Sequence, residues 1–444
     1  MELNRTITRI AGAALGLLML GAISATAQTD MITRTQTFTT DGIDVILTPS
    51  GNGLVSVIIG LEGGPASGET NNPALGPFTS DLITSSGSTR YSKDDLRKFG
   101  SRTSTSIIGE GDLRGISYVM TATAANFDRA WEMLAGMILD PAFDTLEYRN
   151  IMQQRVAQAN RRWSSPEAQA SIIADSLTKL GNPLLSLWTR REDVEAVTIP
   201  MMREFQKKLS ERSRFLVVIV GDIPPALIRE KLKAFASLPL GNYKRPKIPA
   251  LVRATEPALV IADKETPTTY VAAEFVGPAM TDADYWPMQI GMSHLRSNLF
   301  EEIRTKRNLS YAPQSYLTQS YGQTAGVMSV SSTLPDSAFP IMLDELDKMR
   351  RGSFDAADLE ASKQVYITAY YMGRTTTAGK ARAIFSAERN AGDWRKAFAF
   401  DAINSVTKAA VERAFRKYAN TLMIGIAGPK AKITESKFRP RGKM

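Results

Sequence analysis

The sequence contains no cysteine and only one histidine, His294, among its 444 residues. The absence of thiols excludes disulfide bonds, thiolate zinc sites and a cysteine nucleophile. A single histidine has no histidine or cysteine partner for zinc, and carboxylates alone suit calcium or magnesium better. We therefore predict that His294 is a satisfied or solvated side chain and that this chain binds no metal. Stability must come from apolar burial, and a hydrophobic content of 43% is enough for more than one core.

Long apolar runs are also absent, apart from one at the N-terminus. Residues 1–27 begin with two arginines, continue as an apolar stretch from Ile10 to about Ile23, and end in Ala-Thr-Ala. This arrangement is typical of a cleavable signal peptide. No other segment approaches the roughly 18 to 20 apolar residues that a membrane span needs. We expect an exported protein that starts near Gln28 and has no membrane span.

Acidic residues are outnumbered by basic ones, and the formal net charge is +9. Part of the excess lies in the C-terminal tail "KAKITESKFRPRGKM". The tail lacks the interleaved aromatic residues of a single-strand binder, and such charge runs are usually solvated. We expect no nucleic-acid partner.

The two halves of the chain repeat one pattern at a spacing of about 210 residues, which is the size of a domain. Residues 43–69 and 258–282 each indicate a strand, a polar turn and a second strand followed by Gly-Pro-Ala. Each half then has an aspartate-capped loop before a long helix, in "PAFDTLE" and "GSFDAADLE". Each half closes with an apolar strand and a glycine, in "FLVVIVGD" and "TLMIGIAGP".

The patterns within each half predict the α+β class, as two tandem homologous α+β sandwich domains whose antiparallel-rich sheets carry packed helices. In the first half, Thr103–Ile108 and Leu113–Thr123 are expected to pair as a hairpin before an amphipathic helix over Asn126–Leu139. The corresponding elements of the second half are Gln314–Thr318, Val327–Ser332 and Phe339–Met349.

The domain boundaries follow from a change of composition between the halves. Residues 241–257, which are rich in proline and cations, have no apolar periodicity and are expected to be a linker. The first domain is therefore predicted to cover 28–240 and the second 258–444.

The segment "FEEIRTKRNLSYAP" sets a guanidinium and a phenol at a helix-to-strand junction. An apolar-periodic run carries Arg304, breaks at Asn308, and resumes as a strand-like segment that opens with Tyr311. Each residue alone has a structural explanation. Arg304 near a helix C-terminus stabilises the helix dipole by roughly 0.3 to 1 kcal/mol, and Tyr311 is an aromatic residue at a strand start. Neither residue alone therefore indicates a function.

With the duplicated unit, this segment resembles the motif S-R-L-F-x-x-L-R-x-x-x-x-L-x-Y of the pitrilysin/insulysin-type zinc peptidases, the inverzincins. Asn298 replaces the arginine of the motif. A weaker resemblance covers nearly the whole chain after the leader, and it implies half of a clamshell that closes around a peptide. The residues that match the motif are Ser297, Leu299, Phe300, Arg304, Leu309 and Tyr311.

The zinc-binding residues of that family are missing. The family needs H-x-x-E-H and a distant glutamate, in which two histidines bind zinc and the motif glutamate activates water. Alignment on "ALGPFTSDLI" places Pro77 and Asp81 at the histidine positions and Ser80 at the position of the base. Residues 148–166 contain no carboxylate for the distant ligand. The resemblance therefore implies no cofactor in this chain and zinc in a partner subunit.

In that family, the arginine and tyrosine of the motif S-R-L-F-x-x-L-R-x-x-x-x-L-x-Y act from the half-molecule opposite the zinc. Carried over, Arg304 and Tyr311 would act in trans to bind the substrate carbonyl and stabilise the oxyanion. Ser297, Asn298 and Phe300 would contact the substrate. The implied protein is the non-catalytic subunit of a periplasmic, heterodimeric zinc endopeptidase, inactive alone, with unfolded peptides as substrates.

Two other functions stay open from the sequence. A catalytically dead peptide-binding or scaffold protein of the same fold would need neither Arg304 nor Tyr311 for a peptidase. A hydrolase of unrelated mechanism would have to use serines such as those in "NRRWSSPEA" and "LITSSGSTR". No histidine base accompanies these serines, although a serine–lysine dyad is still open.

Overall fold

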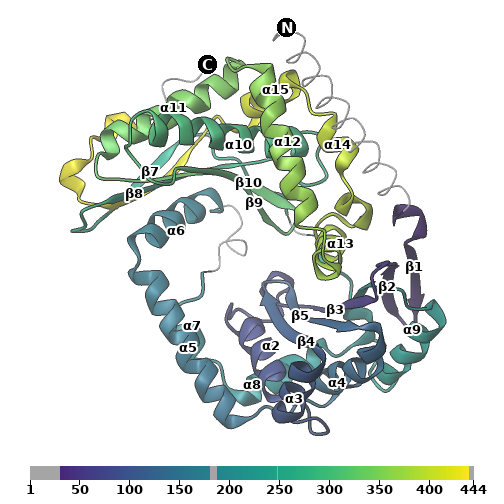
Figure 1. Cartoon of the computed structure of the whole chain (residues 1–444). Helices are drawn as coiled ribbons and strands as arrows, with labels where there is room; N and C mark the ends of the chain where they lie inside the picture. Colours follow the sequence, from purple (N-terminus) through teal and green to yellow (C-terminus); the bar gives the residue numbers. More distant parts are fainter. Residues whose placement is uncertain (1–30, 181–187, 248, 440–444) are drawn as a thin grey trace.

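A computed structural model describes residues 31–180, 188–247 and 249–439, which form two β-sheets with helices packed on both (Figure 1). The first sheet has the strand order β1-β2-β6-β3-β5-β4, and the second has the order β7-β11-β8-β10-β9. Neighbouring strands are antiparallel, except for the parallel pairs β2–β6 and β7–β11. The strands are β1 (Gln36–Thr40), β2 (Ile43–Thr48), β3 (Leu54–Glu62), β4 (Ser106–Asp112), β5 (Gly115–Thr123), β6 (Phe215–Val220), β7 (Ala258–Asp263), β8 (Thr269–Val276), β9 (Gln314–Ser320), β10 (Gln323–Ser332) and β11 (Met423–Gly428).

Helices follow corresponding strands in the two halves. The helices α2 and α4 pack on the first sheet, as α10 and α11 do on the second. The helices of the first half are α2 (Leu75–Ser86), α3 (Lys93–Thr103), α4 (Phe127–Leu139), α5 (Thr145–Ser164), α6 (Pro166–Thr178), α7 (Arg191–Glu195), α8 (Ile199–Leu209) and α9 (Pro225–Leu232). Those of the second half are α10 (Tyr285–Leu299), α11 (Pro335–Arg351), α12 (Ala356–Met372), α13 (Thr377–Ala391), α14 (Phe400–Asn404) and α15 (Lys408–Tyr418).

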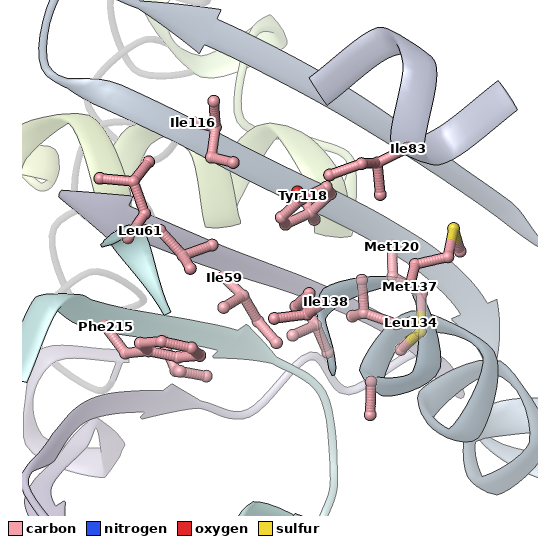
Figure 2. Packing of buried hydrophobic residues seen from close by; sticks show 14 of the residues in the cluster. Ile59, Leu61, Ile83, Ile116, Tyr118, Met120, Leu134, Met137, Ile138 and Phe215 are labelled. Atoms are coloured by element: carbon pink, nitrogen blue, oxygen red, sulfur yellow. The ribbon is translucent and has the colours of Figure 1, made fainter. Parts of the chain in front are cut away.

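The first hydrophobic core lies between the first sheet and its helices (Figure 2). Ile59 and Tyr118, which are paired across β3 and β5, pack in one cluster with Leu134 and Ile138 of α4. Tyr118 is buried, and its hydroxyl donates a hydrogen bond to Oε1 of Gln206 at 3.2 Å. This hydrogen bond satisfies the polar atom of an otherwise apolar side chain in the core.

Each half contributes one helix to the other half's sheet. The α13 helix packs on β3 and β6, where Ile384 and Phe385 contact a face that includes Ile58 and Val218. The α6 helix packs on β8 and β11 of the second sheet, and Figure 1 shows it beneath that sheet. The strands of each sheet carry apolar side chains on both faces, so both faces must be shielded from water. The exchange of α6 and α13 provides this shielding and joins the two halves.

The structure confirms the predicted α+β fold class, and both aspartate caps are present. Asp144 accepts a hydrogen bond from the Glu147 N–H at 2.8 Å, and Asp355 accepts one from the Ala357 N–H at 2.6 Å. The expected strand start at Thr103 is wrong, because Thr103 is the last residue of α3. A capping box at the start of this polar helix stabilises it without apolar periodicity.

Other predictions lie outside what the structure tests. The predicted signal peptide, residues 1–27, falls outside the described residues. The boundaries 28–240, 241–257 and 258–444 stay predictions. Within 31–180, 188–247 and 249–439, none of the helices combines the length and the apolar content of a membrane span.

Candidate functional site

The predicted arginine lies in a π-helical turn. Helix α10 ends at Leu299 and continues as the turn η6 (Phe300–Thr305), after which the Lys306 N–H donates to the Glu301 carbonyl at 2.9 Å. Turns of this width are rare and occur often at functional sites. The apolar periodicity of the sequence did not reveal this change of helix type around Arg304.

The chain reverses at Asn308, whose φ of 51° lies in the left-handed region. The Asn308 N–H donates to the Arg304 carbonyl at 3.1 Å. The expectation that a strand opens with Tyr311 is wrong, because β9 begins at Gln314 and Tyr311 lies in the loop before it. The reversal returns this loop towards the π-helical turn.

The guanidinium and the phenol meet in the structure. The Cζ atom of Arg304 lies 4.9 Å from the centroid of the Tyr311 ring, which is a cation–π distance. Tyr311 is 78% exposed. The Arg304 side chain donates from Nη1 to the neutral Oδ1 of Asn308, and no ion pair joins it to a carboxylate in the described part of the chain. The pair therefore offers a positive charge and an O–H donor, a combination that suits an anionic oxygen.

Two neighbouring cations share one carboxylate. The Glu302 carboxylate accepts hydrogen bonds from Nζ of Lys306 at 2.6 Å and from Nη1 of Arg307 at 2.5 Å. These hydrogen bonds hold the pKa of Glu302 below its ordinary value. Glu302 therefore pairs with Lys306 and Arg307 and not with Arg304.

The other predicted substrate contacts have different environments. Phe300 is 50% exposed, and Ser297 is exposed with its Oγ directed at the Ser293 carbonyl at 3.4 Å. Asn298 turns towards the interior, where its Nδ2 lies 3.4 Å from Nε2 of His294. Phe300 and Ser297 are thus accessible, whereas Asn298 contacts His294. The substrate roles of all three stay predictions.

His294 is a buried side chain with partners for both ring nitrogens. In addition to Asn298, its Nδ1 lies 3.0 Å from Oγ of Ser362, and its ring centroid lies 5.3 Å from that of Phe354. Burial lowers the pKa of His294, which favours the neutral imidazole. This is the satisfied histidine that the sequence predicts.

An ion pair occupies the positions that align with the zinc ligands. Asp81 of α2 accepts a hydrogen bond from Nη2 of Arg155 on α5 at 2.5 Å, and the same Nη2 lies 2.7 Å from the Pro77 carbonyl. Ser80 is buried, and its Oγ donates to the Pro77 carbonyl at 3.1 Å. Sequence reasoning missed Arg155. The available signal was the stretch of residues 148–166, which is rich in arginine and contains no carboxylate.

The described residues contain no group of three His, Cys, Asp or Glu side chains arranged to hold a metal ion. The donor set at Pro77, Ser80 and Asp81 also does not suit zinc, because a guanidinium already occupies the one carboxylate.

Comparisons with known proteins agree with this geometry. Residues 196–366 match the family model of the peptidase M16 inactive domain. A peptidase M16 inactive domain from Pseudomonas fluorescens has a similar crystal structure, with a TM-score of 0.77 and 16% identity over 89% of this chain and 98% of that chain. A protease from Helicobacter pylori is similar with a TM-score of 0.74 and 15% identity, over 89% and 99% of the two chains.

A third similar structure is the periplasmic protease PqqL from Escherichia coli, with a TM-score of 0.73 and 13% identity. The match covers 89% of this chain and 46% of PqqL, so this chain spans about half the length of PqqL. No curated protein matches the sequence.

The chain thus has the fold of M16 peptidases, and residues 196–366 match the inactive domain of that family. The residues that align with the zinc ligands of the family are not zinc ligands in this sequence. The resemblance that the sequence indicates is therefore confirmed.

Proposed function

We propose that this chain is the non-catalytic subunit of an exported, heterodimeric zinc metalloendopeptidase. Its partner carries the H-x-x-E-H motif, and Arg304 and Tyr311 act in trans on the substrate carbonyl in the partner's zinc site. The observation that carries this proposal is the exposed Tyr311 beside a guanidinium that makes no ion pair within the described residues. The Arg155 cation at the aligned zinc positions supports it, because a cation disfavours binding of a second cation there.

The two side chains suit the charge that develops during amide hydrolysis. Zinc held by the partner would activate the water that attacks the carbonyl carbon, and negative charge would then grow on the carbonyl oxygen. Tyr311 donates its O–H to that oxygen, and Arg304 offsets the charge. In a closed chamber from which water is excluded, each such donor lowers the barrier by roughly 3 to 4 kcal/mol. The chain itself lacks the H-x-x-E-H residues that would hold zinc, so the proposal expects it to be inactive without its partner.

Unfolded peptides are the proposed substrates, because an extended chain can add to the edge of a sheet. The strand β9 follows the Tyr311 loop and has a neighbouring strand on one side only. The similarity to a periplasmic protease and the predicted leader support a periplasmic location.

The test is an assay with a quenched fluorescent peptide library. Activity is expected only when this chain is mixed with its zinc-binding partner. Arg304→Ala or Tyr311→Phe should lower kcat/KM of the mixture by about 10²- to 10³-fold, because each removes one donor to the oxyanion. Arg307→Ala is the matched control: it removes a cation that is paired with Glu302 and should change kcat/KM by less than about threefold.

A mixture that is no more active than the partner alone would contradict this proposal. So would Arg304→Ala and Tyr311→Phe variants that are as active as the wild type. Either result would favour the catalytically dead peptide-binding or scaffold protein of the same fold.

A further inference from the structure

Asn308 connects the main-chain reversal to the functional side chains. Its Oδ1 accepts a hydrogen bond from Nη1 of Arg304, and its N–H donates to the Arg304 carbonyl at 3.1 Å. Asn308 thus binds both the side chain and the main chain of Arg304. The Arg304 guanidinium therefore contacts both the Asn308 amide and the Tyr311 ring.

We propose that Asn308 is a positioning residue that holds the Arg304 guanidinium beside the Tyr311 phenol. This inference rests on the proposed function of Arg304 and Tyr311, and it adds a third residue to their site. Asn308 itself need not touch the substrate, because it acts through Arg304.

The main-chain conformation at Asn308 favours this contact. Its φ of 51° lies in the left-handed region, which asparagine and glycine tolerate better than other residues. The next residue is fixed as well, since the Leu309 N–H donates to the Ile303 carbonyl at 2.9 Å. Two main-chain hydrogen bonds therefore define the direction from which the Asn308 side chain reaches back to Arg304.

The chemistry of the acceptor also matters. A carboxylate would hold the guanidinium more strongly but would neutralise its charge. The amide oxygen of Asn308 orients the guanidinium and leaves its charge for the oxyanion. Glu302, a carboxylate of the same turn, instead contacts Lys306 and Arg307. Arg304, the cation that is proposed to act, thus has a neutral partner, whereas Lys306 and Arg307 have a carboxylate as theirs.

Orientation has a kinetic consequence for a long side chain. A partly exposed arginine populates many rotamers, and restricting it before the reaction removes an entropic cost from the transition state. Loss of the Asn308 amide should therefore reduce kcat more than it changes KM.

The experiment compares Asn308→Gly with the wild type in the complex with the zinc-binding partner. Glycine keeps the left-handed main chain and removes only the amide. We expect kcat for a quenched fluorescent peptide to fall about tenfold, with KM changed by less than about twofold. In the Arg304→Ala background, Asn308→Gly should have no further effect, because a positioning residue acts only through the group that it positions.

Two further measurements separate orientation from charge. In the chain alone, the NMR order parameter of the Arg304 Nε–H should fall in Asn308→Gly, because the guanidinium loses its anchor. Asn308→Asp should keep this order parameter high and still lower kcat, because the new carboxylate neutralises Arg304.

The inference is overturned if Asn308→Gly keeps wild-type kcat while Arg304→Ala is impaired, or if the order parameter does not change. It is also overturned if Asn308→Gly lowers kcat equally in the Arg304→Ala background. If Arg304→Ala itself keeps full activity, the proposed function fails, and this outcome is distinct from a failure at Asn308.

Discussion

The residues at the aligned zinc positions join two helices without a metal. The Arg155 guanidinium contacts Asp81 and the Pro77 carbonyl, and its Cζ lies 5.8 Å from the centroid of the Phe78 ring. Phe78 in turn stacks on Tyr148 at 5.4 Å. The Arg155 cation and two aromatic rings thus connect α2 with α5 at the positions that align with the zinc ligands of M16 peptidases.

Arg155→Met tests this pair at the residue scale. The substitution keeps much of the side-chain volume but leaves Asp81 and the Pro77 carbonyl without their donor. We expect the free energy of unfolding, measured by urea titration, to fall by about 1 to 3 kcal/mol. Asp81→Asn keeps an acceptor for Arg155 and, because Asp81 is 40% exposed, should cost less than about 1 kcal/mol. An Arg155→Met variant as stable as the wild type would show that the pair contributes nothing.

At the scale of the element, the position of α6 depends on small residues. The contact of α6 with the second sheet is made by alanines, and a Cβ atom added at Gly425 would lie 2.1 Å from the Ala170 carbonyl oxygen. Main chain therefore packs against main chain at this crossing, with no room for one more methyl group. The alanines that form this contact are Ala170, Ala174, Ala272 and Ala427.

Gly425→Ala should accordingly destabilise the protein. The added methyl group must push α6 away from β11, and we expect the free energy of unfolding to fall by about 1 to 3 kcal/mol in a urea titration. Gly373→Ala is the matched control, because an added Cβ there meets only ordinary contacts of 3.6 Å and beyond. Equal stability of Gly425→Ala and Gly373→Ala would mean that α6 is free to shift.

At the scale of the whole molecule, the charged side chains at the two junctions, where α13 meets the first half and α6 meets the second sheet, differ in their partners. Where α13 meets the first half, Arg389 donates to Glu62 at 2.8 Å and to both carboxylate oxygens of Asp112. Where α6 meets the second sheet, Glu274 is buried, and its Oε2 has no hydrogen-bond partner in the described structure. Burial raises the pKa of Glu274 to about 8, and the nearby Asp175 adds to this effect. Arg389 is thus paired with two carboxylates, whereas the junction of α6 holds a carboxyl group whose raised pKa favours the neutral form at pH 7.

The pH dependence of unfolding follows from Glu274. The ordinary pKa is 4.5, so the unfolded chain releases this proton at a lower pH than the folded protein does. The free energy that protonated Glu274 contributes to folding is present in full below pH 4.5. It is lost as the pH rises to about 8. Glu274→Gln keeps a neutral side chain, so its stability relative to the wild type should rise by roughly 1 to 4 kcal/mol between pH 4.5 and pH 8.

Urea titrations of both proteins at the two pH values measure this difference. Glu435→Gln, at an exposed position, is the control and should show no comparable rise. A constant difference between Glu274→Gln and the wild type across this pH range would contradict the expected ionisation.

Much of the fold could be predicted because its signals are local. The strands are marked by apolar runs, α5 and α12 by aspartate caps, and the duplication by a repeat of the whole pattern. The polar α3 helix and the π-helical turn escaped prediction, since a capping box and a change of helical width leave little trace in apolar periodicity. At the site, the resemblance of one short segment to a family motif was enough to single out Arg304 and Tyr311.

The sequence by itself determined the α+β class, the tandem arrangement, the absence of zinc ligands and the arginine–tyrosine pair. These features depend on residue type and on neighbours in the same segment. Only the tertiary structure decided the exchange of α6 and α13, the pairing of Arg155 with Asp81 across 74 positions, and the burial of Glu274. The physical reason is that contacts between distant segments depend on which surfaces pack together, and this information is absent from the local pattern of either segment.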